Sequence, residues 1–181
     1  FRYVLNRFAF VPDPYKEFME SVVTGDIRYA DASKRIPEEE NSVDVLYSSH
    51  MLEHLDKEET HCFLIEAKRV LAPNGIIRIV VPDFDRLVEK YIASNKPQQF
   101  IDDSVLVGVK PKTILKKLQY LIQGHGWHHS MYNRRTLSEL FHEYGFSNIE
   151  ILEAGESRIE NTSGLDLSTH LGYSIYLEAQ K

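Results

Sequence analysis

One stretch, Val43–Leu55 (VDVLYSSHMLEHL), constrains the fold more than any other part of the chain. Its start, Val43–Tyr47, is an almost continuous apolar run, which is typical of a central strand in a parallel sheet. The polar residues Ser48-Ser49-His50 end that strand, and a helical pattern follows them. A strand that ends in polar residues and leads into a helix predicts an α/β layered fold. Ligands of such folds bind at the carboxyl ends of the strands.

Other segments alternate between strand and helix patterns, as this fold class requires. Strands are expected at Asp26–Tyr29, Gly75–Val81, Asn148–Ala154 and Tyr173–Ala179, and helices at Glu58–Leu71, Asp85–Ala93, Thr113–Gln123 and Arg134–Tyr144. We expect a polar linker at residues 94–103 and a turn at Pro73-Asn74-Gly75. The strand ends at residues 29–32, 48–51 and 82–84 should meet in one crevice.

Composition narrows the function classes. A net charge of −6 gives no general attraction for nucleic acid or for anionic membranes. No apolar run approaches the roughly 20 residues that a membrane-spanning helix needs. The single cysteine, Cys62, leaves no internal disulfide framework and fits a reducing compartment. We therefore expect one domain over residues 1–181 in a cytoplasmic protein. Nothing in the composition indicates a nucleic-acid partner, although a local basic patch stays an alternative.

Two strand ends carry candidate binding residues. Asp31 follows one strand and precedes the small Ala32. A carboxylate there can accept from an exocyclic amine while the next backbone N–H donates to a ring nitrogen, which would recognise the edge of an adenine. The alternative is that Asp31 only caps a turn. Ser48 and Ser49 can contact a ligand, cap the following helix, or do both.

The segment His50-x-x-Glu53-His54 matches the H-x-x-E-H zinc pattern of one class of peptidases. That pattern needs an unbroken helix, whereas His50 follows directly on a strand. Sequence spacing identifies no third ligand either. We expect no metal, and a zinc hydrolase that uses His50 and His54 stays an alternative.

The loop Gly124–Met131 (GHGWHHSM) gathers several histidines, including His128 and His129. Histidine titrates near neutral pH and can remove a proton from a substrate hydroxyl or amine. Trp127 can pack against a substrate or anchor the loop. The cluster is therefore either an acceptor-side site or a structural feature.

Together these segments resemble the class I S-adenosylmethionine-dependent methyltransferases of the type 11 kind. The resemblance is strongest from Ala30 to Asp83. Asp44–His54 matches the family's D-x-(apolar)-x-S-x-H-x-L-E-H strand, and Arg69–Gly75 matches its R-V-L-x-P-x-G helix ending. The resemblance implies a Rossmann-like sheet with a parallel centre and an antiparallel C-terminal strand. It also implies S-adenosylmethionine as the cofactor.

The resemblance implies two groups of site residues. The first borders the cofactor, with adenine at the first two positions: Asp31, Ala32, Ser48, Ser49 and His50. The second faces the methyl acceptor, a small molecule or another nucleophile: His128, His129 and Tyr132. The implied activity is methyl transfer to an oxygen, nitrogen or carbon atom.

The glycine-rich loop of this family has no counterpart here, because Gly25 is the only glycine in the first 74 residues. We expect the N-terminal strands that flank that loop to be missing, which would leave this chain incomplete for activity. Residues 1–24 are expected to form a helical insertion, and residues 94–131 a helical and loop insertion on the substrate side. A catalytically inactive binding domain with the methyltransferase fold is the main alternative.

Overall fold

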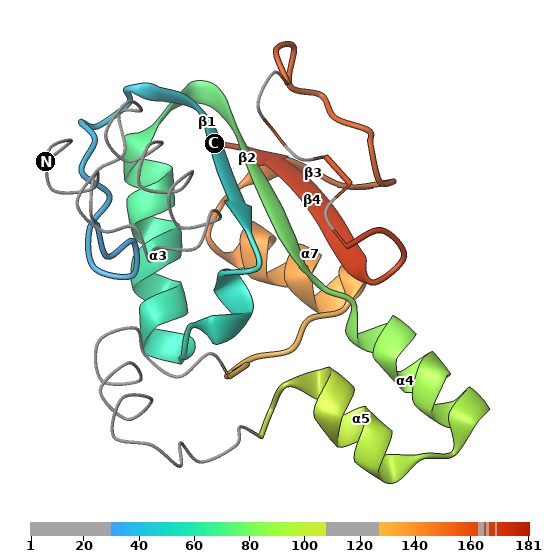
Figure 1. The fold of residues 1–181 in the computed structure, drawn as a ribbon. Coiled ribbons are helices and arrows are strands. Elements are labelled where there is room, and N and C mark those ends of the chain that lie inside the picture. The colour runs from blue at the N-terminus through green and yellow to red at the C-terminus, as the bar shows by residue number, and fades with distance from the viewer. Residues whose placement is uncertain (1–29, 108–126, 163–164, 166, 169) are drawn as a thin grey trace, which may run out of the picture. The chain divides into compact units, whose positions relative to one another are not determined.

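The computed structural model describes residues 30–107, 127–162, 165, 167–168 and 170–181 (Figure 1). The chain divides into two compact units, residues 1–31 and 32–181, and all the elements named below belong to the second unit. The predicted insertion at residues 1–24, the strand Asp26–Tyr29 and the helix Thr113–Gln123 lie outside the described residues.

The second unit combines a four-stranded sheet with helices. In chain order the elements are β1 (Val43–Ser49), the 3-10 turn η1 (Leu52–His54), α3 (Lys57–Val70), β2 (Leu71–Pro82), α4 (Phe84–Ser94), α5 (Pro97–Ser104), α7 (Arg134–Glu143), β3 (Ser147–Leu152) and β4 (Ser174–Gln180). The strands and helices predicted for the described residues are present, with their ends shifted. A search of the described helices finds none that is both long and apolar enough to cross a membrane.

The strands lie in the order β1-β2-β4-β3. β1 and β2 run parallel, whereas β4 runs antiparallel to both β2 and β3. This arrangement confirms the predicted Rossmann-like sheet, with its parallel part and its antiparallel C-terminal strand. The prediction that β1 is a central strand is wrong within the described residues, where β1 is an edge strand and is half-buried. An apolar run indicates that the faces of a strand are covered, not that both of its edges are paired.

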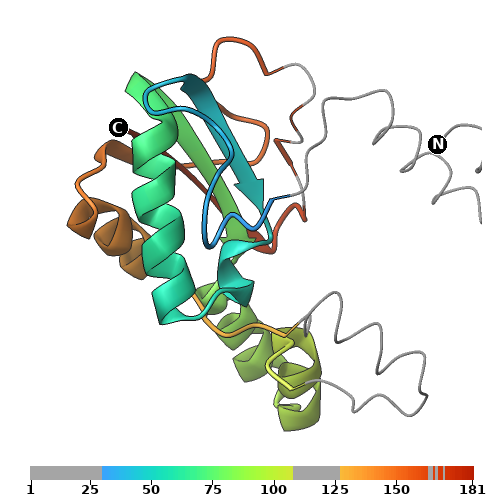
Figure 2. The same ribbon diagram turned by 90° about the vertical axis from the view of Figure 1, so that its left-hand side faces the viewer.

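One face of the sheet is apolar and packs against α3 and α7, which lie side by side in Figure 2. Alternate residues of two strands meet buried residues of the two helices: Ile77, Ile79, Val81, Ile175, Leu177 and Ala179 from the sheet, with Phe63, Leu64, Ala67, Leu137 and Phe141 from the helices. α3 begins at a capping box in which the Asp56 carboxylate accepts from the Glu58 and Glu59 N–H groups. The predicted amphipathic helix is therefore present, and its apolar face is buried against the sheet.

The opposite face of β2 and β4 carries a buried ion pair. Arg78 Nη1 lies 2.7 Å from Glu178 Oε1, and both side chains are fully buried. Arg78 also donates to the backbone carbonyls of Glu156 and Leu167, at 2.9 and 3.2 Å. The segment after β3 therefore covers this face with polar groups that satisfy the pair.

Two local predictions are wrong. The predicted polar linker at residues 94–103 contains helix α5, which has Pro97 at its first turn, where the missing N–H of proline costs nothing. The predicted turn Pro73-Asn74-Gly75 lies inside β2 as an irregularity in the pairing with β1. Asn74 takes a left-handed φ of 66° there. A Cβ on Gly75 would lie 3.0 Å from two backbone carbonyl oxygens, so this close approach favours glycine.

Candidate functional site

The carboxyl ends of β1 and β2 lie side by side. The backbone N–H of His50 donates to the Val80 carbonyl at 2.9 Å, which extends the pairing to the end of β1. His50 then turns the chain away with a left-handed φ of 51°. The ends of β1 and β2 are therefore adjacent, as predicted, and the crevice itself stays a prediction. The third predicted strand end includes residues outside the described part of the chain.

The His50 imidazole is held at both nitrogens. Its Nδ1 donates to Glu53 Oε1 at 3.0 Å, and its Nε2 lies 3.2 Å from the Ser174 hydroxyl, which can donate to it. Glu53 and His54 follow in η1, a 3-10 turn, so H-x-x-E-H does not lie on an unbroken helix. Because both of its ring nitrogens are already paired, His50 is poorly placed to join His54 on a metal ion.

The loop before α7 is held against η1 by backbone hydrogen bonds. The Glu53 carbonyl accepts from the N–H groups of His129 and Ser130, at 2.8 and 3.1 Å. His54 Nδ1 donates to the Trp127 carbonyl at 3.0 Å. These bonds bring the His128 ring within 4.9 Å of the His54 ring, centroid to centroid. A sequence-distant loop thus becomes part of the edge where β1 ends.

Glu53 lies at the centre of this group and is 1% exposed. His128 Nε2 is 4.0 Å from Glu53 Oε1. The other carboxylate oxygen, Oε2, is buried and has no hydrogen-bond partner among the described residues. Burial lowers the pKa of His128, while the nearby Glu53 carboxylate opposes that shift, so the ring is neutral at neutral pH.

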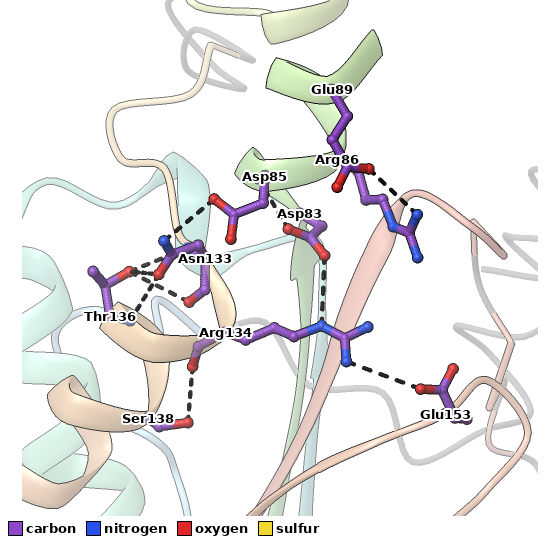
Figure 3. Close-up of polar contacts among 9 residues, drawn as sticks. All are labelled: Asp83, Asp85, Arg86, Glu89, Asn133, Arg134, Thr136, Ser138 and Glu153. Carbon is purple, nitrogen blue, oxygen red and sulfur yellow. Dashed lines mark hydrogen bonds and ion pairs between the residues drawn. The ribbon is translucent and has the colours of Figure 1, made fainter.

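The end of β2 is closed by Asp83, which is buried and engaged with its neighbours (Figure 3). Its carboxylate accepts from the Asp85 N–H at 3.0 Å and caps α4. Arg134 of α7 approaches the same carboxylate, with Nε 3.8 Å from Oδ2. Tyr132 pairs with Asp83 in a short parallel bridge. Asp83 therefore joins α4 and α7 to the sheet.

Comparisons with known proteins find one similar sequence family and several structures with the same fold. The sequence model described as "Methyltransferase domain" matches residues 11–79. A possible histamine N-methyltransferase from Thermotoga maritima has 13% identity over 86% of this chain and 63% of its own, with a TM-score of 0.50. A methyltransferase from Methanosarcina mazei has 16% identity over 85% of this chain and 66% of its own, with a TM-score of 0.51. Residues 11–79 are therefore similar to a methyltransferase domain, and the chain shares the fold of S-adenosylmethionine-dependent methyltransferases.

A third methyltransferase structure, from Mesorhizobium loti, has 16% identity over 92% of this chain and 76% of its own, with a TM-score of 0.51. A search of curated proteins finds no match. At these identities the solved structures establish the fold alone. The chain spans less than two thirds of the length of the first two structures. S-adenosylmethionine is the cofactor of the family.

The residues predicted to border the cofactor fall into two parts. Ser48 and Ser49 are half-buried at the end of β1, with His50 beside them. Ala32 is half-buried and packs against the core. Asp31 is exposed and belongs to the other compact unit, so its place at adenine stays a prediction. At the end of β1, the hydroxyls of Ser48 and Ser49 and the nearby backbone groups have the hydrogen-bonding chemistry that an adenosine needs.

The residues predicted to face the acceptor do not point to one place. His128 turns towards Glu53, whereas His129 is exposed and lines an open hollow of about 610 Å³ between α3 and α7. Tyr132 is buried and lines both that hollow and a small cavity beside Glu53. Sequence reasoning missed the contact of Ser174 with His50 and the approach of His128 to Glu53. The sequence signal for these contacts is Glu53 itself, a charged residue in the largely apolar segment Met51–Leu55.

Proposed function

We propose that the protein transfers the methyl group of S-adenosylmethionine to a small-molecule nucleophile. One observation carries this proposal: the family's polar turn, Ser48-Ser49-His50, stands at the carboxyl edge of the parallel strands. Ligands of such sheets bind at that edge. The similarity to the methyltransferase family supports S-adenosylmethionine as the cofactor. The edge supplies small and hydroxylated residues that can receive it.

In this proposal the chain's own residues bind and orient the reactants. When bound, the cofactor supplies a methyl group that its sulfonium already activates. Asp31 and Ala32 recognise adenine, while Ser48, Ser49 and His50 border the adenosine and the sulfur. The main task of the protein is to hold the acceptor in line with the methyl group and to exclude water.

On the acceptor side we propose three residues with distinct positions: His128, His129 and Tyr132. The neutral His128 can take a proton from the acceptor, since burial lowers its pKa. Tyr132 lines both the small cavity next to His128 and the open hollow, and in the hollow it can orient the acceptor. His129 lies in the open hollow, where it can contact a larger acceptor.

Isothermal titration of the native protein with S-adenosylmethionine and S-adenosylhomocysteine tests the proposal. We expect saturable binding of both, with the Asp31→Ala variant about 10- to 100-fold weaker, because it loses a hydrogen bond to a charged group. Asp102→Ala, which removes an exposed carboxylate of α5, serves as the matched control. Absence of binding by the folded protein would overturn the proposal. Binding of S-adenosylmethionine without methylation of any nucleophile would favour the alternative, a catalytically inactive binding domain with the same fold.

A further inference from the structure

We propose that Glu53, His54 and His128 form a binding site for a divalent transition-metal cation of the Zn²⁺ type. Each residue offers one ligand atom, and the three atoms lie within 4.8 Å of one another. Ligand atoms about 2.0–2.1 Å from one zinc ion lie at most about 4.2 Å apart, so small side-chain rotations would suffice. The H-x-x-E-H spacing alone identifies no third ligand. The fold supplies one by bringing His128 next to Glu53 and His54.

The Glu53 carboxylate is the strongest indication of a missing ligand. Its side chain is 2% exposed, and Oε2 has no hydrogen-bond partner among the described residues. Burying a charge without a partner costs several kcal/mol, so such groups are paired or bind metal ions. His50 occupies only the other oxygen, Oε1. Oε2 therefore remains available to a cation.

Both histidines are arranged as metal ligands usually are. His54 Nδ1 donates to the Trp127 carbonyl, which leaves the lone pair of Nε2 free to bind a cation. The His128 ring forms a hydrogen bond with the backbone of Ser104. Metal-binding histidines commonly hold their second nitrogen in this way, which fixes the tautomer and the ring direction.

A cavity of about 20 Å³ lies beside the cluster and is lined by residues that include Glu53, His128, Asp83, Met131 and Tyr132. That volume is enough for one water molecule. Three protein ligands with one open position form the usual arrangement of catalytic zinc sites. Imidazole nitrogens favour Zn²⁺ over Mg²⁺ and Ca²⁺, which prefer oxygen ligands only.

Metal binding here does not rest on methyl transfer and can be measured without S-adenosylmethionine. The two roles of His128 exclude each other, because a cation would occupy the lone pair that otherwise takes a proton. A methyltransferase that binds zinc would thus use His128 to position the ion. A failure of metal binding leaves the proposed methyl transfer untouched.

The test is calorimetric titration of the untagged native protein, freed of metal by a chelator, with Zn²⁺ and separately with Mg²⁺. We expect one equivalent of Zn²⁺ with a dissociation constant of about 1 µM or tighter, and no Mg²⁺ binding. Glu53→Gln, His54→Gln and His128→Gln should each weaken Zn²⁺ at least about 100-fold, since even outer contacts are worth 10–100-fold. His142→Gln, an exposed histidine of α7, should change nothing.

X-ray absorption of the zinc-loaded wild-type protein gives a second measurement that needs no variant to fold. We expect a shell of nitrogen and oxygen with two imidazoles and no sulfur. The proposal is overturned by sulfur from Cys62, by Mg²⁺ binding in place of Zn²⁺, or by the absence of stoichiometric zinc. An equal effect of His142→Gln and His128→Gln would overturn it as well.

Discussion

Glu178 and Glu53 are both buried glutamates, yet the fold treats their carboxylates differently. Glu178 is 0% exposed and Glu53 is 1% exposed. Glu178 accepts hydrogen bonds from Arg78 at 2.7 Å, the Ser157 hydroxyl at 2.6 Å and the Arg158 N–H at 2.9 Å. Glu53 accepts one, from His50, and its second oxygen has no partner among the described residues.

This difference separates a structural carboxylate from one that is suited to a ligand. Burial by itself would raise the pKa of Glu178, but the hydrogen bonds from Ser157, Arg158 and Arg78 outweigh it and hold the pKa below its usual value. The fold therefore supplies Glu178 with all that its charge requires. The partners that Glu53 lacks would come from a bound cation.

The largest effect is expected from Glu178→Gln. Removing one partner of a buried ion pair leaves Arg78 uncompensated, and such changes cost about 3–5 kcal/mol. Urea unfolding followed by circular dichroism measures the loss at neutral pH. A loss below about 1 kcal/mol would contradict the structural role. Glu89→Gln, which weakens an exposed ion pair with Arg86, is the matched control and should have almost no effect.

Removing one hydroxyl near each glutamate sharpens the contrast, because Ser157 bonds to Glu178 directly, whereas Ser174 bonds to His50, the partner of Glu53. Ser157→Ala takes a donor from the buried Glu178 and should cost about 2 kcal/mol, because hydrogen bonds to charged groups are the stronger ones. Ser174→Ala removes the group that pairs with His50 and should cost less than about 1 kcal/mol. Thermal and urea unfolding of the two variants compare them directly, and equal losses would refute the ranking.

Acid should act on Glu178 as well. Because its folded pKa is lowered, the stability that this charge contributes is present above the ordinary glutamate value of 4.5. It is lost as the pH falls below that value towards the folded pKa. The free energy of unfolding should fall there by up to about 1.4 kcal/mol per pH unit from this group. Urea titrations of the wild type and of Glu178→Gln over this range test it, and parallel pH profiles would contradict the assignment.

The sequence predicts the elements better than it predicts the site. Apolar runs and caps act locally, so β2, β4 and α3 are recognisable from short windows. The sequence does not predict α5, because this helix has only eight residues, most of them polar and most of them exposed. The turn at His50 was predicted, but its contacts were not. His128 reaches Glu53 through a loop far away in the sequence, and no local pattern encodes such a contact.

The smallest change in stability is expected from Glu53→Gln in metal-free protein. The amide can still accept from His50 Nδ1, and it removes a buried charge whose second oxygen has no partner among the described residues. Its new N–H groups lie near His54 and His128, whose lone pairs can accept them. The loss should therefore stay within about 1 kcal/mol, against about 3–5 kcal/mol for the same substitution at Glu178.

Adding zinc should make the free energies of unfolding of this variant and of the wild type differ. Ligand that binds only the folded state stabilises it by about 2.7 kcal/mol at a concentration 100 times the dissociation constant. The wild type should gain that amount in urea unfolding, whereas Glu53→Gln should gain almost nothing. A metal-free loss as large as that of Glu178→Gln would mean that Glu53 is satisfied within the fold, and the contrast between the two carboxylates would then fail.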